Sequence, residues 1–361
     1  MVSRRVFLGV PLALSCARRA SPAYRGYAFV ANQEGRAVAA VDLQALVVTR
    51  HIPIQGAPTQ VLAAQSRPSV FALTPDSGSI FEIQSDHLSL KRSVQTGPAI
   101  SMSLDPKERA LFVLTRQALV RVGLDSFRVE SRITLPEDPV QFALAQDGKS
   151  AAVSFARSVR IIDLAAQQPG APLGEGEFGS VCFLSDSSTV IAADRGGRRL
   201  SIYDAPSAKL ITHLPLAVRP DNLCFNSDGG QLFVTGDGLD AVVIVYPYHT
   251  PEVGQTVLAG HGPGPMAASA RYLFIASPQA GNVSVLSVGT QKVTAVVAVG
   301  SDPGCVVVTP DDQYALVLNR RSGDMTVLRI EKIQTNRPNP AAVRTVIPVG
   351  SRPVSAAVRS V

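Results

Sequence analysis

The sequence predicts an all-β fold built from eight copies of one four-stranded unit, and three observations support this. The 361-residue chain is 46% hydrophobic and 17% charged, which suits a globular protein with a large core. Its apolar segments are short, rich in Val, Ile and Leu, and separated by Gly, Pro, Asp and Asn, as strands joined by turns are. A five-residue motif also recurs along nearly the whole chain at spacings of 39 to 42 residues.

The recurring motif marks one strand of each unit. Its copies are AFVAN (28–32), VFALT (70–74), LFVLT (111–115), AAVSF (151–155), VIAAD (190–194), LFVTG (232–236), LFIAS (273–277) and ALVLN (315–319). A turn and a second apolar strand follow each copy, such as AVAAVDL (37–43). A third strand comes next, such as VTAVVAVG (293–300), and a Pro then opens a fourth, such as PVQFALAQDG (139–148). Four strands in about 42 residues is the size of a blade, so we expect a β-propeller of four-stranded antiparallel blades.

The two ends of the chain predict how the ring closes. Counting strands places residues 27–32 in the second strand of a blade and leaves residues 354–361 as a spare first strand. We expect these two segments to pair, because pairing joins the ends and removes exposed sheet edges. The repeat count predicts eight blades, with seven as the alternative. Unit four departs from the pattern at 168–179 (QPGAPLGEGEFG), and unit eight carries an insertion at 331–342.

These units resemble the YVTN family of β-propeller repeats, and the resemblance covers residues 27–361. That family is best known with seven blades, and related propellers include sugar-lactone hydrolases. The resemblance implies an exported bacterial propeller. Because the chain has no Trp, it lacks the tryptophan docking motif of quinone-dependent propeller dehydrogenases.

The N-terminus has the features of an export signal. Residues 3–16 (SRRVFLGVPLALSC) combine a charged start with an apolar run that is too short to span a bilayer. Arg4 and Arg5 lie in a stretch that closely resembles the twin-arginine signal. Cys16 ends a stretch that resembles a bacterial lipobox, and we favour its lipidation over a plain signal peptide with an incidental Cys. We therefore expect a signal peptide at 1–16, a tether at 17–26 and one propeller domain at 27–361, located in the periplasm or anchored to a membrane, the outer membrane included.

The charge and the reactive side chains exclude several functions. The net charge of +6 falls to +4 without Arg4 and Arg5, which is too mild to imply nucleic acid. The five histidines have no metal-ligand spacing, and we expect Cys182, Cys224 and Cys305 to be small buried thiols. The sequence contains no GxSxG, P-loop or HExxH stretch. We therefore assign no catalytic residue, no metal and no cofactor.

The candidate binding residues lie in loops expected at the mouth of the central channel, where propellers usually bind ligands. His261 lies in GHGPGP (260–265), between an outer strand and the next innermost strand. The basic residues expected on the same face include Arg36, Arg116, Arg157, Arg195, Arg198, Arg199, Arg219, Arg320, Arg321 and Arg352. From these we take Arg195, Arg198, Arg199, Arg320 and Arg352 as binding candidates. Acidic residues in the same loops nearly balance these charges, so we expect no strong field of one sign.

Three functions are compatible with these features. The favoured one is an exported, lipid-anchored and non-catalytic binding or scaffold module that holds a protein or glycan at the bacterial cell envelope. It would be a monomer, contact the membrane only through its lipid and bind no nucleic acid. The alternative is a lactonase-like hydrolase with His261 as base and nearby arginines as a substrate clamp. The third is a cofactor-bearing redox propeller, because eight blades and twin-arginine export both occur among such proteins.

Overall fold

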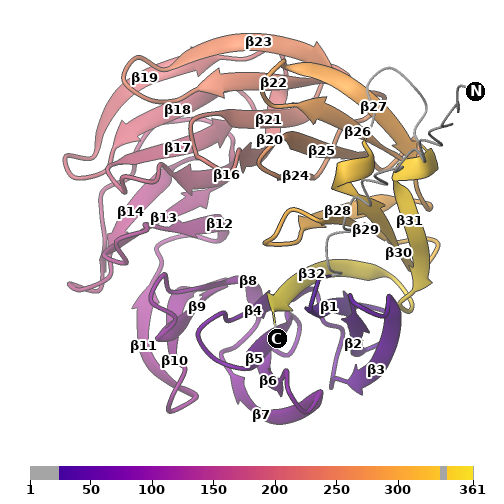
Figure 1. Cartoon of the computed structure of the whole chain (residues 1–361). Coiled ribbons are helices and arrows are strands. Elements are labelled where there is room, and N and C mark those ends of the chain that lie inside the picture. Colours follow the sequence, from indigo (N-terminus) through magenta and orange to yellow (C-terminus); the bar gives the residue numbers. More distant parts are fainter. Residues whose placement is uncertain (1–23, 334–339, 361) are drawn as a thin grey trace, which may run out of the picture.

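The computed structural model describes residues 24–333 and 340–360. These residues form eight four-stranded antiparallel sheets, arranged as blades around a central opening (Figure 1). The fold is therefore an eight-bladed β-propeller, as the repeat count predicts, and the seven-blade alternative is wrong. Within the described ranges, no helix is long and apolar enough to cross a membrane.

Each blade is numbered here by the order of its motif strand in the chain, and its strands are given from the inside outward. Blade 1 contains β32 (Pro353–Ser360), β1 (Gly26–Asn32), β2 (Ala37–Asp42) and β3 (Val47–Pro53). Blade 2 contains β4 (Gln60–Ala63), β5 (Ser69–Thr74), β6 (Ser79–Gln84) and β7 (Ser89–Gln95). Blade 3 contains β8 (Ala99–Leu104), β9 (Ala110–Thr115), β10 (Ala118–Gly123) and β11 (Arg128–Thr134). Blade 4 contains β12 (Pro139–Leu144), β13 (Ser150–Phe155), β14 (Val159–Asp163) and β15 (Gln168–Pro169).

The second half of the ring repeats the same order. Blade 5 contains β16 (Phe178–Phe183), β17 (Thr189–Asp194), β18 (Arg199–Asp204) and β19 (Lys209–Pro215). Blade 6 contains β20 (Arg219–Phe225), β21 (Leu232–Asp237), β22 (Ala241–Tyr246) and β23 (Glu252–Leu258). Blade 7 contains β24 (Met266–Ala268), β25 (Tyr272–Ser277), β26 (Asn282–Ser287) and β27 (Lys292–Ala298). Blade 8 contains β28 (Pro303–Val308), β29 (Tyr314–Asn319), β30 (Asp324–Arg329) and β31 (Val343–Pro348), with two 3-10 turns, η1 (Ile330–Lys332) and η2 (Pro340–Ala342), in its insertion.

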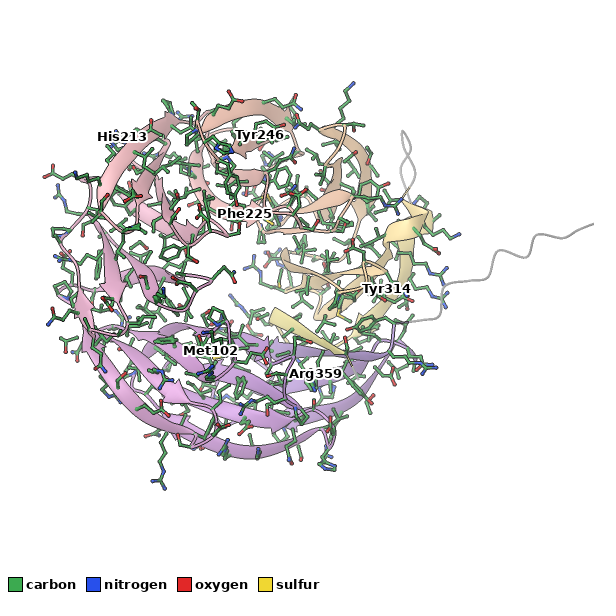
Figure 2. All side chains as sticks on the ribbon, turned by 60° about the vertical axis from the view of Figure 1, so that its left-hand side comes forward. Met102, His213, Phe225, Tyr246, Tyr314 and Arg359 are labelled. Carbon is green, nitrogen blue, oxygen red and sulfur yellow. The ribbon has the colours of Figure 1, made fainter. Side chains whose placement is uncertain are left out.

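The burial of each strand follows its place in the blade. Every residue of β5 and of β9 is buried, because both faces of a blade pack against neighbouring blades. Such strands read as continuous apolar runs in the sequence. The outermost strands instead alternate, as β11 does. In Figure 2, Phe225 of the innermost strand β20 lies near the central opening and His213 of the outermost strand β19 lies at the outer rim.

The ring closes between the two ends of the chain, as predicted. β32 pairs antiparallel with β1, with Ala28 opposite Val358 and Val30 opposite Ala356. The Tyr24 hydroxyl lies 2.8 Å from the Ser360 hydroxyl, and burial raises the Tyr24 pKa. The described fold thus also includes residues 24–26, which precede the domain predicted at 27–361.

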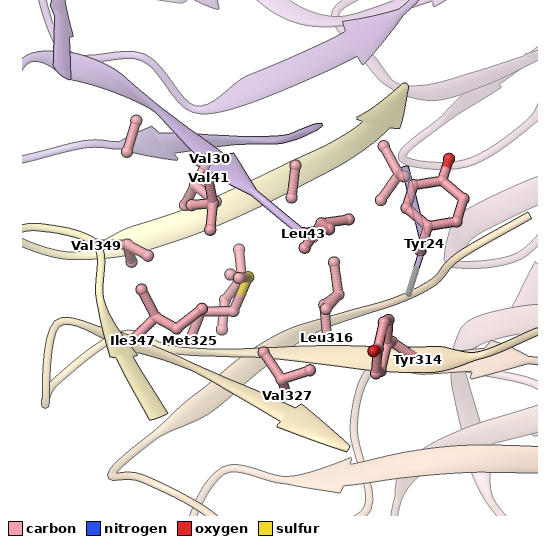
Figure 3. Packing of buried hydrophobic residues seen from close by; sticks show 14 residues of the cluster. Tyr24, Val30, Val41, Leu43, Tyr314, Leu316, Met325, Val327, Ile347 and Val349 are labelled. Carbon is pink, nitrogen blue, oxygen red and sulfur yellow. The ribbon is translucent and has the colours of Figure 1, made fainter. Parts of the chain in front are cut away.

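Tyr24 packs between the first and last blades. Tyr24 is only 5% exposed and belongs to a cluster with Leu43, Tyr314, Leu316 and Val349 (Figure 3). Burying large side chains of this kind stabilises a fold by about 1.5–3 kcal/mol each. Of the tether expected at 17–26, residues 24–26 belong to the described fold, while residues 17–23 and the signal at 1–16 lie outside the described residues.

Blade 4 has the irregular outer edge that its sequence indicates. Its outermost strand β15 has two residues, and a single bridge between Val159 and Leu173 continues the pairing. Pro169 and Pro172 contribute no backbone N–H to this edge. The chain then crosses to blade 5 through residues 170–177, which contain Gly170, Gly174 and Gly176.

The loops divide between two faces of the ring. We call the mouth face the side formed by the loops after each motif strand and the loops that cross between blades; among them are 156–158, 170–177, 195–198, 259–265, 278–281 and 320–323. On the opposite face, adjacent blades are tied by side chains that accept from a neighbouring loop. Glu108 accepts from the backbone N–H groups of Gln65 and Ser66, each at 2.7 Å, and Asp312 accepts from that of Ala270 at 2.7 Å.

Candidate binding face

All six predicted binding residues lie on the mouth face, but they are spread over several blades. Arg195 and Arg198 lie in the loop after β17, and Arg199 begins β18. Arg320 follows β29, while His261 lies in the crossing from blade 6 to blade 7. Arg352 lies between β31 and β32. The structure therefore brings together the three arginines of blade 5 and leaves the other three residues in separate loops.

Arg195 is held by acidic side chains from two blades. Its Nη1 lies 2.7 Å from Asp221 Oδ1, and its Nη2 lies 3.5 Å from Asp237 Oδ2. Its Nε lies 3.9 Å from Glu177 Oε1. Burial raises the pKa of Asp221, and the nearby carboxylates add to this while Arg195 opposes it. The guanidinium is thus engaged in fixing the blade 5–blade 6 boundary.

The remaining predicted arginines also have partners. Arg199 Nε donates to Asp194 Oδ2 at 2.8 Å, and the Asp194 side chain is 1% exposed. Arg320 Nη2 lies 2.8 Å from Asp302 Oδ1, and Arg352 Nη1 lies 3.3 Å from Glu34 Oε1. Arg198 donates to the backbone carbonyl of Ala217. The contacts of Arg198, Arg320 and Arg352 join a turn to the loop beside it, whereas that of Arg199 lies within the hairpin of β17 and β18.

His261 forms a pair with Asp240. Its Nδ1 lies 3.0 Å from Asp240 Oδ2, and the Gly262 N–H donates to Asp240 Oδ1 at 2.8 Å. The hydrogen bond and the charge of Asp240 raise the His261 pKa, while the contacts from Gly262 and His261 lower the Asp240 pKa. The His261 side chain is 69% exposed. This geometry orients the imidazole and leaves its second nitrogen free of Asp240.

Three arginines on the same face differ from the predicted set. Arg116, Arg157 and Arg321 are exposed, and no ion pair or side-chain hydrogen bond joins them to another described residue. Each lines a pocket. Arg116 lines one of about 380 Å³ and Arg321 one of about 520 Å³, whereas Arg157 lines two, of about 500 and about 620 Å³. The sequence marks each of them only as a basic residue soon after a motif strand, and Arg195 and Arg320 share that feature. The two groups differ in whether the guanidinium has an acidic partner in the folded structure.

The three thiols of the described residues are free, and their raised pKa values favour the unreactive protonated form. Burial raises the pKa of Cys182 to about 12 and those of Cys224 and Cys305 to about 11. A thiol with a raised pKa has little nucleophilic thiolate near neutral pH. In the part of the chain that the structure describes, no group of three or more His, Cys, Asp or Glu side chains could hold a metal ion.

Comparisons with known proteins identify the fold class of the chain. No family model and no curated protein matches the sequence. Among solved structures, dihydro-heme d1 dehydrogenase NirN is 14% identical with a TM-score of 0.73, over 94% of this chain and 79% of that one. Citrobacter koseri AztD is 13% identical with a TM-score of 0.70, over 93% of this chain and 98% of that one. Kuenenia stuttgartiensis hydrazine synthase is 15% identical with a TM-score of 0.59, over 89% and 99%. The chain thus shares the β-propeller fold with proteins of differing roles, and at these identities the likeness extends to the fold alone.

Proposed function

We propose that this chain is an exported, lipid-anchored propeller of the YVTN type that binds a protein or glycan partner at the bacterial cell envelope. Arg4, Arg5 and Cys16 support export and anchoring, and the mouth face would carry the binding. The chain would act as a binding or scaffold module rather than as a catalyst. It would work as a monomer, without nucleic acid or cofactor.

One observation carries the binding proposal. The mouth face consists of loops fixed by contacts such as Arg195–Asp221 and Arg320–Asp302, and open pockets lie between those loops. The pocket-lining arginines Arg116, Arg157 and Arg321 remain free to contact a ligand. A surface whose loops are fixed before binding loses less conformational entropy when a partner docks.

Affinity capture of the tagged full chain from crosslinked native membranes, followed by mass spectrometry, tests the binding role. We expect one partner near stoichiometric recovery, and a variant with Arg116, Arg157 and Arg321 all changed to Glu should lose it. A matched triple variant at Lys107, Lys149 and Lys209, outside the mouth face, should retain the partner. Recovery of lipid and background alone would contradict the proposal.

Lipid labelling tests the anchor separately. Cells given a radiolabelled fatty acid should label the wild-type chain, and C16A should remain unlabelled and leave the membrane fraction. Replacing Arg4 and Arg5 by Lys should reduce export. A wild-type chain that stays unlabelled would overturn the anchor without touching the binding role.

The His261–Asp240 pair supports one second candidate, a lactonase-like hydrolase. A carboxylate that orients an exposed imidazole is an arrangement used in general-base catalysis. In that case the purified chain should hydrolyse sugar lactones, and H261A should lower the rate at least about 100-fold, the usual size of a general-base contribution. An unchanged rate in H261A would exclude this role for the pair.

A further inference from the structure

We propose that the two pockets beside Arg157 form one groove that takes an extended acidic peptide segment of a partner protein. This inference rests on the binding function proposed above and assigns its site and its ligand class. The pockets, of about 500 and about 620 Å³, share Arg157 and Glu175 as lining residues. They are therefore adjacent compartments on either side of one ridge, on the mouth face between blades 4 and 5.

The groove follows from the irregular edge of blade 4. The chain leaves the shortened β15 and crosses to blade 5 through a Gly-rich segment, instead of the short Pro turn found elsewhere in the ring. Gly174 has a φ of +68°, and a Cβ at this position would lie 2.2 Å from the Tyr203 hydroxyl. A Cβ at Gly176 would lie 2.8 Å from the Asp194 carboxylate. Both glycines are therefore needed for the loop to take this path beside the pockets.

The walls of the groove are fixed by hydrogen bonds, most of them part-buried. Asp194 accepts from the N–H groups of Gly197 at 2.9 Å and Glu177 at 3.2 Å, as well as from Arg199. Across the ridge, Arg160 Nη1 donates to the Gly170 carbonyl at 2.9 Å. A ligand would therefore meet a groove formed in advance, with little ordering left to do.

Several residues that line the larger compartment carry hydrogen-bond donors without a partner in the described part of the chain. Arg157 is exposed and unpaired among the described residues, and the backbone N–H groups of Gly174 and Glu175 donate to no other described group. Ser158, 6% exposed, lines the same compartment, and its hydroxyl has no hydrogen-bond partner within residues 24–333 and 340–360. A guanidinium beside free backbone N–H groups is suited to a carboxylate, which accepts from both.

Two features narrow the ligand to an acidic peptide. Arg157 and Arg160 line this compartment with Glu137 and Glu175, and Arg160 Nη2 lies 3.8 Å from Glu137 Oε1. The charges of the lining therefore balance, and a carboxylate with one charge would meet less repulsion from Glu175 than a doubly charged phosphate would. No aromatic side chain lines either compartment, so a sugar ring would find no stacking face. An extended peptide suits two adjacent compartments, with its acidic side chain on Arg157 and a neighbouring residue across the ridge.

Selection from a displayed library of random heptapeptides, with the full chain immobilised, tests this assignment. We expect enrichment of peptides that contain Asp or Glu. The best of them, made synthetically, should bind R157A at least about tenfold more weakly than wild type, since a charge-assisted hydrogen bond contributes on this scale. R109A removes an exposed arginine of the opposite face and should bind as wild type does. E175Q should bind more tightly, because it removes a repelling carboxylate.

The opposing results are equally specific. Absence of enriched acidic peptides, or equal binding to R157A and wild type, would overturn the assignment. Oligogalacturonate that binds through Arg157 while no peptide does would also overturn it, in favour of an acidic glycan. These outcomes differ from failure of the proposed function, because affinity capture could still recover a partner whose contacts map to another part of the mouth face.

Discussion

At the scale of single residues, charged groups in this propeller stabilise boundaries between blades. Glu82 of β6 is the clearest case, because its side chain is 1% exposed. It accepts from Ser69 Oγ at 2.7 Å, from Arg92 Nε at 2.5 Å and from Lys91 Nζ at 3.2 Å. Arg92 in turn donates to the Leu124 carbonyl of the next blade at 2.7 Å and lies 4.6 Å from the centre of the Phe127 ring. One buried carboxylate thus joins blades 2 and 3.

Replacing Glu82 should destabilise the ring in a pH-dependent way. Burial would raise the Glu82 pKa, but the contacts from Ser69, Arg92 and Lys91 outweigh it and hold the pKa below its ordinary range. We expect E82Q to lower the free energy of unfolding by about 2–3 kcal/mol at pH 7, as loss of a partly buried ion pair does. Because a lowered pKa gives stability that is lost as pH falls through the folded value, the difference should shrink below about pH 4.

Urea unfolding at several pH values measures this difference. E252Q, at an exposed position of β23, serves as the matched control and should unfold like wild type. A difference between E82Q and wild type that stays constant down to pH 3 would argue against the ionised pair.

The His261–Asp240 pair makes a second prediction at this scale. Because Asp240 raises the His261 pKa, D240N should return it toward the ordinary value of about 6.5. The chemical shifts of the His261 ring protons against pH would give both values. D76N, which changes an exposed acid in another loop of the mouth face, should leave the titration unmoved. An identical His261 titration in D240N would contradict the pairing.

At the scale of elements, the sequence predicts strands well and loop contacts poorly. The motif LFVLT (111–115) falls within β9 because a strand buried on both faces must be apolar throughout. The role of Arg195 could not be read in the same way, since its closest partner, Asp221, is 26 residues away and in the next blade. Arg157 lies in an equivalent turn without such a partner. Arg195 and Arg157 differ in the geometry of the loops around them, and the repeat pattern in the sequence carries no information about loop geometry.

The pairing of β32 with β1 is the element on which ring closure depends. Deleting residues 353–361 should expose the edge of β1 and the cluster around Tyr24, and lower the melting temperature by about 5 °C or more. Adding the missing segment as a synthetic peptide should restore part of the loss. Deleting Val361 alone is the control and should have little effect. Calorimetry that finds the 353–361 deletion as stable as wild type would contradict closure by this pair.

At the scale of the whole molecule, the two faces of the ring differ in what they offer a partner. The opposite face carries hairpin turns tied by residues such as Glu108 and Asp312, and the chain enters the fold there at Tyr24. The mouth face carries the pockets of Arg116, Arg157 and Arg321. In the lipid-anchored form proposed above, a tether leading to Tyr24 would hold the opposite face nearest the membrane and leave the mouth face open.

Site-specific photocrosslinking on both faces tests most directly that the mouth face is the binding face. A photoreactive residue would replace Glu175 or Arg321 on the mouth face, and Lys107 or Lys149 on the opposite face, in the full chain expressed in its native cells. All four positions are exposed. We predict one crosslinked partner of the same mass from both mouth-face positions and none from the other two. Capture of a partner from Lys107 or Lys149 alone would contradict the account.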